Sequence, residues 1–387
     1  MTLKIVRIAL ALAATSTAIT FAPIASAQSA SVSEEFGQFR PQPDGSATQI
    51  DYSIWDEALK FFVLRMGQSI REGAPRVDPG MGTRRVYGHE SRYRLEGNRI
   101  AFSFLEPEVI ESLTQYREDL QQTADLVQIA KLPKNEQLAF WINLHNVAVI
   151  EQIARSYPLT QPYKIRPMGG DSLLDDAKFI TVNGVSMSPS DIRKHIVYPN
   201  WADPKVIYGF FHGDIGSPSI QREAFNGSNI DVVLGVSGLE FVNSLRGAAK
   251  VGSTLQVNKV YEEARPFYFP QWPADLRAHL QTYGDEELRA DLIATSRLEA
   301  TIEERDIADL SRGETDPGLN FVVENAGTDA EGLRSFRVPA NVQRMLAERA
   351  RKMEKLRRRG LIGKVIVLPG QGGDANEEPV ASEEATP

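Results

Sequence analysis

Residues 135–153 read NEQLAFWINLHNVAVIEQI, the most hydrophobic helical stretch predicted in this chain. A helix that is apolar around most of its circumference is buried inside a protein. The predicted helix begins near Lys134 and continues to Pro158. We therefore expect most of it to lie in the core, with the other elements packed around it.

Amide and imidazole side chains interrupt this apolar run. Asn143 and Asn146 are three residues apart and share one helix face, whereas His145 lies about 100° away from Asn146. Buried amides need hydrogen-bond partners. The asparagines are therefore expected either to hold neighbouring loops or to contribute directly to a site. For His145 the alternatives are a satisfied core histidine and a ligand-binding side chain.

A second polar group lies in the turn HGDIGSPS, residues 212–219. The apolar run 206–211 predicts a buried strand before the turn, and a helix is expected near Pro218 with Ser217 as its N-cap. The free N–H groups of a helix N-terminus stabilise a bound anion or a reacting oxygen. The turn therefore predicts either a simple cap or a nucleophile at Ser217, although its pattern differs from the G-x-S-x-G elbow.

A third candidate is the pair Asp191 and His195 in SPSDIRKHIV. Their spacing lets the carboxylate face the imidazole, as in the second half of a nucleophile–base–acid arrangement. The alternative is a first-turn aspartate beside a surface histidine. His212 and Asp214 have no third ligand at a recognisable spacing, so no metal is expected. No cofactor is expected either, because Walker, Rossmann and H-E-x-x-H patterns are absent from the sequence.

The remaining patterns predict an α+β fold that is rich in helix and has a small, mainly antiparallel sheet. Asn183-Gly184 between two short β-like runs predicts a hairpin. Ser188 is expected to cap a helix that has proline at its first position. Further helices are expected at 51–70, 107–120, 229–246, 275–310 and 339–359, and further strands at 254–260 and 365–368.

The composition excludes several classes of protein. The 387 residues include no cysteine, which excludes disulfides, thiolate zinc sites, iron–sulfur clusters and a cysteine nucleophile. The formal net charge is −8, and we expect no nucleic-acid partner because such binding needs a basic surface. Apolar residues make up 42% and charged residues 24%, values typical of a globular protein.

The N-terminus predicts export. A short positive region and an apolar stretch precede an A-x-A cleavage site at residues 25–27. We expect cleavage near Ala27 and a soluble mature protein that begins at Gln28, has no transmembrane span and is periplasmic or secreted. An uncleaved anchor helix is the alternative.

The chain is expected to divide into five parts, which are a signal peptide (1–27), a disordered leader (28–48), a main domain (49–325), a C-terminal extension of helix and strand (326–369) and a disordered acidic tail (370–387). The helix of the extension is strongly basic. It is expected either to contact anionic lipid or peptidoglycan, or to pack against the main domain with its charges outside.

Together these motifs resemble domain-of-unknown-function family 547, which occurs in secreted bacterial proteins and in plants. The resemblance is carried by the 135–153 stretch, the Asn-Gly hairpin with the SPSDIRKHIV helix, the turn that ends at Pro218, VNKVYEEARPFYF at 257–269 and, more loosely, DPGLNFV at 316–322. It covers roughly residues 50–325. The family pattern of a cysteine turn with a neighbouring Glu-His pair is similar to that of cysteine-peptidase-like or transferase-like sites.

This chain departs from the family pattern where a reaction would occur. The positions it keeps are Asn143, Asn146, Asp191 and Ile192. Arg193 and Lys194 stand where the Glu-His pair falls, with His195 one place later. His212 and Ser217 stand where the two cysteines of the turn are common. The resemblance therefore implies a family member that lacks the usual reacting groups.

Two functions remain as alternatives. The first is a non-catalytic binding domain for a small molecule, a peptide or a cell-envelope component, with a pocket at the degenerate site. Its candidate ligand-binding residues are Asn143, His145, Asn146 and Asp214. The second is a hydrolase or acyl-transfer enzyme with Ser217 as nucleophile, and its candidate catalytic residues are Ser217, His212, His195 and Asp191. A weaker third is an envelope-associated scaffold that uses residues 339–364.

Overall fold

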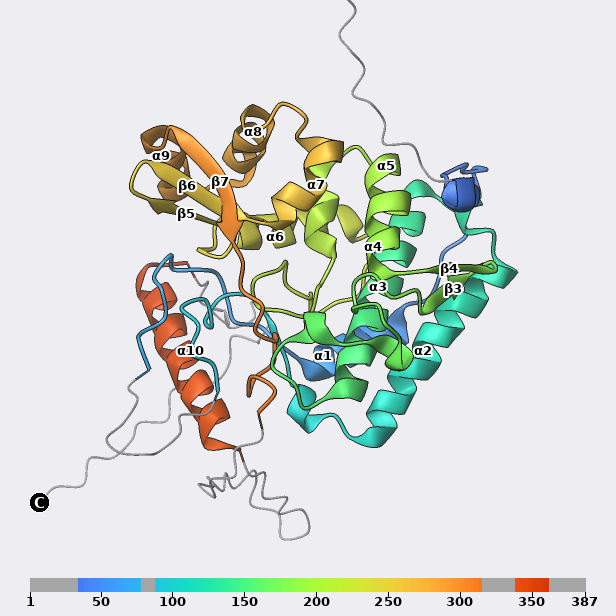
Figure 1. Ribbon diagram of the computed structural model, residues 1–387, viewed down its shortest axis with the longest axis horizontal. Helices are drawn as coiled ribbons and strands as arrows, with labels where there is room; N and C mark the ends of the chain where they lie inside the picture. Colours follow the sequence, from blue (N-terminus) through green and yellow to red (C-terminus); the bar gives the residue numbers. More distant parts are fainter. Residues whose placement is uncertain (1–33, 78–87, 315–337, 362–387) are drawn as a thin grey trace, which may run out of the picture.

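The computed structural model describes residues 34–77, 88–314 and 338–361 (Figure 1). Helices predominate in this part of the chain, and the strands form small sheets in which antiparallel pairing is the more common. The expected α+β fold with a small, mainly antiparallel sheet is therefore confirmed. The predicted signal peptide, acidic tail, strand at 365–368 and DPGLNFV segment lie outside the described residues.

The described elements follow one another from an N-terminal helical turn to a C-terminal helix. The α-helices are α1 (Ser53–Phe62), α2 (Pro107–Leu126), α3 (Lys134–Ser156), α4 (Pro189–Asp191), α5 (Tyr198–Asn200), α6 (Ile230–Val242), α7 (Val260–Tyr268), α8 (Ala274–Tyr283), α9 (Glu286–Ala294) and α10 (Ala340–Arg358). The other helical turns are η1 (Glu34–Phe39), η2 (Phe102–Phe104), η3 (Ile129–Lys131), η4 (Pro162–Lys164), η5 (Pro167–Gly169), the π-helical η6 (Ile192–Val197) and η7 (Pro204–Gly209). The strands are β1 (Val63–Leu64), β2 (Arg99–Ile100), β3 (Ile180–Val182), β4 (Val185–Met187), β5 (Ala248–Val251), β6 (Thr254–Asn258) and β7 (Arg297–Ile302).

Helix α3 is the centre of the fold, as its sequence predicts. Its side chains are buried without interruption from Glu136 to Glu151. Helix α2 packs along it, and η6 and α6 contact other parts of its surface (Figure 1). A helix surrounded in this way has no solvent-facing stripe, which explains why its apolar residues do not follow a single face.

The hairpin and the helix start after it form as predicted. Strands β3 and β4 pair antiparallel, and Asn183 and Gly184 in the turn both have positive φ, as two-residue hairpin turns require. Ser188 Oγ accepts from the Asp191 N–H at 3.0 Å, and an Asp191 carboxylate oxygen accepts from the Ser188 N–H at 2.9 Å. This capping box starts the short helix α4, which continues into η6.

A three-stranded sheet closes one end of the molecule. Strands β5 and β6 pair antiparallel and β6 pairs parallel with β7, while α7, α8 and α9 connect β6 to β7. The expectation of helix throughout 275–310 is wrong, because α9 ends at Ala294 and β7 follows. In β7 the inward positions alternate with exposed ones: Leu298 and Ile302 are buried and Ala300 is partly buried, which is the period of a strand.

Two expectations around the 212–219 turn are also wrong. Residues 204–209 form the 3-10 helix η7 and not a strand. Residues 206–209 of η7 are buried and η7 packs against α6 and α7, so this part of it is an apolar run, and a short apolar run does not distinguish strand from helix. No helix begins at Pro218; the next one is α6, which starts at Ile230.

The two ends of the described chain pack against the body. Phe36 and Phe39 of η1 are buried, although the sequence predicts a disordered leader at that position. The basic helix α10 forms as predicted, and it lies beside the segments that flank residues 78–87 (Figure 1). Lys352 Nζ donates to the carbonyls of Gly67 and Leu95 at 3.2 and 2.6 Å. None of the helices in the described ranges is both long and apolar enough to cross a membrane.

Candidate functional site

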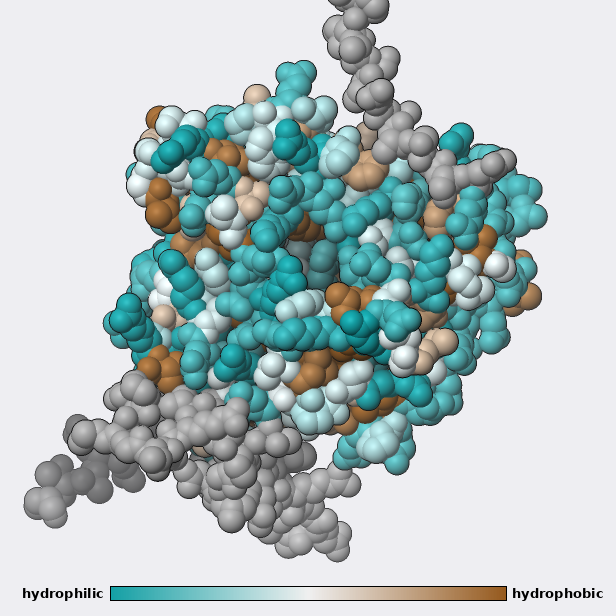
Figure 2. All heavy atoms as spheres, viewed as in Figure 1, coloured by the Kyte–Doolittle hydropathy of each residue, from teal (hydrophilic) through white to brown (hydrophobic). Residues whose placement is uncertain are grey.

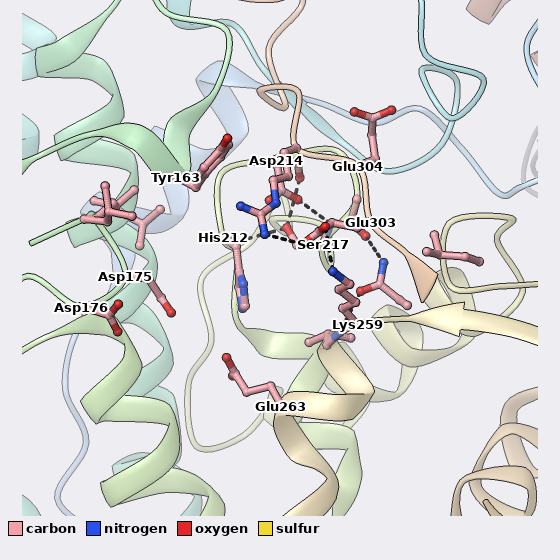
Figure 3. A pocket seen from close by; sticks show the side chains of 18 residues that line it. Tyr163, Asp175, Asp176, His212, Asp214, Ser217, Lys259, Glu263, Glu303 and Glu304 are labelled. Atoms are coloured by element: carbon pink, nitrogen blue, oxygen red, sulfur yellow. Dashed lines mark hydrogen bonds and ion pairs between the residues drawn. The ribbon is translucent and has the colours of Figure 1, made fainter. Parts of the chain in front are cut away.

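A cavity of about 320 Å³ lies among the 212–217 turn, residues 173–176, the start of α7 and the end of β7. Figure 2 shows a hollow near the middle of this face, surrounded by hydrophilic side chains. Its polar lining residues (Figure 3) include Tyr163, Asp175, Asp176, His212, Asp214, Ser217, Lys259, Glu263, Glu303, Glu304 and Arg305. Its apolar lining residues are Val149, Leu173, Leu174, Val260 and Ile302.

Arg193 lies behind two of the lining carboxylates and is fully buried. Its guanidinium binds Asp175 through two bonds of 2.8 and 2.7 Å and Glu263 through two bonds of 2.8 and 3.0 Å. The remaining N–H donates to His145 Nε2 at 3.0 Å. All five N–H groups of the guanidinium are therefore used inside the protein. Arg193 holds the carboxylates in place and has no donor left for a ligand.

The charge of Arg193 determines the protonation of its neighbours. Burial by itself would raise the pKa of Glu263, but attraction to Arg193 outweighs it and lowers the pKa to about 2. The same attraction holds the pKa of Asp175 below its usual range. Burial and the Arg193 charge together lower the pKa of His145 well below its usual value. His145 is therefore neutral, and because its Nε2 accepts from Arg193, its Nδ1–H donates to Asn146 Oδ1 at 3.1 Å.

The asparagines of α3 hold loops and do not reach the cavity. Asn143 exchanges two hydrogen bonds with the backbone of Phe225, at 2.7 and 3.2 Å. Asn146 donates to the Gly209 carbonyl at 2.9 Å and accepts from the Phe211 N–H at 3.0 Å. These side chains are almost completely buried and none of them lines the cavity, nor does His145. Of the two roles expected for the asparagines, the structure supports the holding of loops.

The Ser217 hydroxyl is bound within its own turn. Oγ donates to the Asp214 carbonyl at 3.1 Å and accepts from the His212 N–H at 3.4 Å. The Ser217 N–H donates to Asp214 Oδ1 at 2.7 Å. Among the described residues, Ser217 Oγ makes no hydrogen bond to an imidazole. Because no helix follows the turn, Ser217 is not the helix cap that the sequence predicts, and the expected environment of helix N–H groups does not form.

The turn itself is held close to neighbouring backbone by glycine. A Cβ on Gly216 would lie 2.4 Å from the Glu304 carbonyl oxygen, and Gly216 N–H donates to that same carbonyl at 3.1 Å. Gly213 has a φ of 94°, which favours glycine. The loop that follows β7 therefore holds the turn in place through backbone contacts.

His212 and Asp214 line the cavity with shifted pKa values. Burial, followed by repulsion from Arg193, lowers the pKa of His212 to about 4, and its Nε2 is buried without a hydrogen-bond partner. Burial raises the pKa of Asp214 to about 6. At neutral pH the His212 ring is therefore uncharged, and an imidazole with this pKa is a weak base.

Asp191 and His195 face one another but lie outside the cavity lining. His195 Nε2 is 3.7 Å from Asp191 Oδ1, so the expected spacing does bring the two side chains together. The His195 ring stacks on Phe36 with 5.3 Å between centroids, and its side chain is 41% exposed. The structure therefore does not assemble Ser217, His195 and Asp191 into a triad.

Several charged residues of the cavity are not among the site residues that the sequence predicts. Lys259 donates to Glu303 at 2.9 Å, and Arg305 also donates to Glu303 while its guanidinium lies 4.4 Å from the centre of the Tyr163 ring. Glu263 lies in the VNKVYEEARPFYF stretch, and that resemblance is the signal that points to it. In the described ranges, no group of three His, Cys, Asp or Glu side chains is arranged to hold a metal ion.

The fold and the cavity define a helix-rich α+β domain with an open and mostly acidic pocket. Residues 129–242 match the model of the family described as "Protein of unknown function, DUF547". The resemblance is therefore confirmed over that segment, which contains α3, Arg193 and the 212–217 turn but ends before Glu263. No curated protein and no solved structure matches the chain.

Proposed function

We propose that this protein is a non-catalytic binding domain that takes a small ligand into the cavity at its degenerate site. One observation carries the proposal. Groups at the positions where a reaction would occur are engaged within the protein, because Arg193 uses all its donors internally and the Ser217 hydroxyl bonds to backbone. The cavity beside them stays open at about 320 Å³, a volume within the range of small-molecule sites.

The geometry supports the hydrolase alternative less well. A serine nucleophile needs a base within about 3.2 Å of its hydroxyl to remove the proton. Ser217 Oγ donates to a backbone carbonyl instead, and the nearby His212 has a pKa of about 4. A fluorophosphonate probe that reacts with activated serines distinguishes the two functions.

The contacts of α10 support an internal role for this helix and give less support to an envelope scaffold. Lys355 and Arg359 pair with Glu72 at 2.7 Å, and Arg349 donates to the carbonyl of Arg65. Basic side chains that are paired inside the protein are less available to anionic lipid or polymer. We propose that α10 stabilises the segments on either side of residues 78–87.

We further propose that the protein acts after export. This proposal depends on the sequence of residues 1–27, which lie outside the described residues. N-terminal sequencing of the protein from fractionated cells tests it, and a mature chain that begins at Gln28 in the periplasmic or secreted fraction is the expected result. Full-length protein in the cytoplasm would contradict it.

The binding function is tested by closing the cavity. Leu173 lines the cavity and is 38% exposed, so Leu173→Trp fills space at the opening without disturbing the core. Leu126→Trp is the matched control, because Leu126 is 87% exposed at the end of α2 and lies outside the lining. The three proteins are purified from the producing organism and compared by native mass spectrometry. We expect a retained small molecule on the wild type and the control but not on Leu173→Trp; equal retention on both variants, or none on the wild type, would contradict the proposal.

A further inference from the structure

The cavity has an excess of negative charge that its own cations do not balance. Six carboxylates line it, but only Lys259 and Arg305 among the lining residues are cationic, and both already bind Glu303. Asp175 and Glu263 share Arg193, with Lys194 Nζ 3.6 Å from Glu263. Three lining carboxylates remain without an ion pair among the described residues, namely Asp176, Asp214 and Glu304.

Of these three carboxylates, Asp176 is the one that a ligand can reach directly. The Asp176 side chain is exposed and makes no hydrogen bond or ion pair in the described part of the chain. Figure 3 shows Asp175 and Asp176 on one side of the cavity, Lys259 on the other, and His212 between them above Glu263. The His212 ring is uncharged and its Nε2 lacks a partner, so it adds no positive charge to offset the carboxylates.

From this arrangement we infer that the ligand carries an ammonium group, held by the carboxylates of the cavity, on a short apolar body. The inference rests on the proposed binding function. Attraction between a cation and several carboxylates in a partly closed cavity is stronger than at an open surface, because less water separates the charges. The apolar body would contact the five aliphatic side chains of the lining, as is usual for small-molecule sites.

The same observations disfavour an anion. The sequence predicts a helix N-terminus at Ser217, which would attract negative charge. No helix starts there, and the Ser217 N–H donates to Asp214, so this donor is already used. An anion entering the cavity would therefore meet six carboxylates, and the two cationic side chains of the lining, Lys259 and Arg305, are both paired with Glu303.

Three probes of equal chain length separate the ligand classes. Cadaverine carries an ammonium at each end of five carbons, 1,5-pentanediol is neutral, and glutarate carries two carboxylates. Binding to the full chain is measured by isothermal titration calorimetry at pH 7 and low salt. We expect cadaverine to bind, the diol and glutarate not to bind, and the affinity for cadaverine to fall as salt is added.

Asp176→Asn tests whether the carboxylates hold the ammonium. This change removes one exposed charge and leaves the Arg193 contacts intact. Affinity for cadaverine should fall about two- to fivefold, as expected for the loss of one solvent-exposed ion pair. Glu57→Gln is the control, because Glu57 is exposed on α1 and does not line the cavity. A similar loss in both variants would show non-specific attraction and would overturn the inference.

The outcomes separate this inference from the proposed function. If glutarate or the diol binds and Leu173→Trp abolishes that binding, the cavity is a binding site but the ammonium class is wrong. If cadaverine fails to bind, the inference is also wrong, whereas retention of a native ligand by the wild type and its loss on Leu173→Trp would still uphold the binding function.

Discussion

Helix α3 and the cavity use similar polar side chains in opposite ways. On α3, Asn143 and Asn146 are completely enclosed, and their amide groups bond to the backbone of loops that lie 82 and 63 to 65 residues away. In the cavity, the charged groups come from separate segments and several of them stay partly exposed. The comparison teaches that one continuous stretch within the segment matched by the family model builds the support, whereas the open surface is assembled from several segments that lie far apart in the sequence.

Arg193 connects these two regions, so its replacement should lower the free energy of unfolding at least as much as any other change proposed. In Arg193→Met the carboxylates Asp175 and Glu263, whose side chains are 43% and 19% exposed, lose their shared buried cation, and His145 loses its donor. Removing one partner of a buried ion pair costs about 3–5 kcal/mol of the free energy of unfolding, and because water reaches Asp175 we expect a loss of about 3 kcal/mol. Urea unfolding at pH 7, followed by circular dichroism, measures this loss.

The control for Arg193 is its neighbour in sequence. Lys194 also approaches Glu263, but at 3.6 Å and with a side chain that is 36% exposed. Lys194→Met should cost less than about 1 kcal/mol, as is usual for exposed pairs. Equal losses in the two variants would show that Arg193 does not join the support to the cavity.

Asn146→Leu removes hydrogen bonds that α3 makes to a neighbouring loop, and it changes no residue that lines the cavity. The variant leaves the Gly209 carbonyl, the Phe211 N–H and the His145 Nδ1–H buried without their partner. Each unsatisfied buried group costs about 1–3 kcal/mol, so we expect a loss of about 3 kcal/mol in the same urea experiment. Asn135→Leu on the same helix is the control, because Asn135 is only partly buried and its amide donates to Asp231 at the surface. If the control loses as much stability, the amides of α3 do not have the role assigned to them.

The fold was predictable from sequence wherever a local pattern determines it. The apolar run of α3, the Asn-Gly turn and the Ser188 helix cap each depend on neighbouring residues, and all of them form as expected. The apolar run 206–211 predicts a strand, whereas residues 206–209 belong to η7. This prediction is wrong because burial on every side makes a helix as apolar as a strand.

The cavity was predictable only in part. His212, Asp214 and Ser217 were found because one turn holds them together in sequence. The contacts of Arg193 join residues 18 and 70 positions apart, and no local pattern indicates such pairs. The Ser-Pro cap signal at 217–218 failed because the turn is bonded to the loop after β7, and the chain continues to Ile230 before the next helix.

The two regions should also differ in whether a histidine can be replaced without breaking a hydrogen bond of its side chain. His212 lies in the cavity with an unpartnered Nε2, whereas both ring nitrogens of His145 have partners. Burial lowers the folded pKa of His212 from 6.5 to about 4. As pH falls below 6.5 the unfolded chain takes up a proton that the folded protein does not, so this histidine costs stability on the acid side.

His212→Gln should therefore make the protein less sensitive to acid. Relative to the wild type, the variant should gain about 2 kcal/mol between pH 8 and pH 5, because the wild type loses that amount through His212 over the same range. Urea unfolding at both pH values measures the gain, and the difference at pH 8, where both states are neutral, is the baseline. An unchanged difference at the two pH values would show that the His212 ring is not held neutral by the cavity.

Ser217→Ala should have the smallest effect and gives the sharpest test of function. The variant loses one hydrogen bond to the Asp214 carbonyl and one from the His212 N–H, which together should cost about 1 kcal/mol of the free energy of unfolding. Because the hydroxyl is bound to backbone and has no imidazole partner among the described residues, a fluorophosphonate probe should label neither protein, while a serine hydrolase added to the same reaction is labelled. Labelling of the wild type that disappears in Ser217→Ala would show an activated nucleophile. The cavity would then be a catalytic site. The comparison between α3 as a structural support and the cavity as a non-catalytic binding site would be wrong.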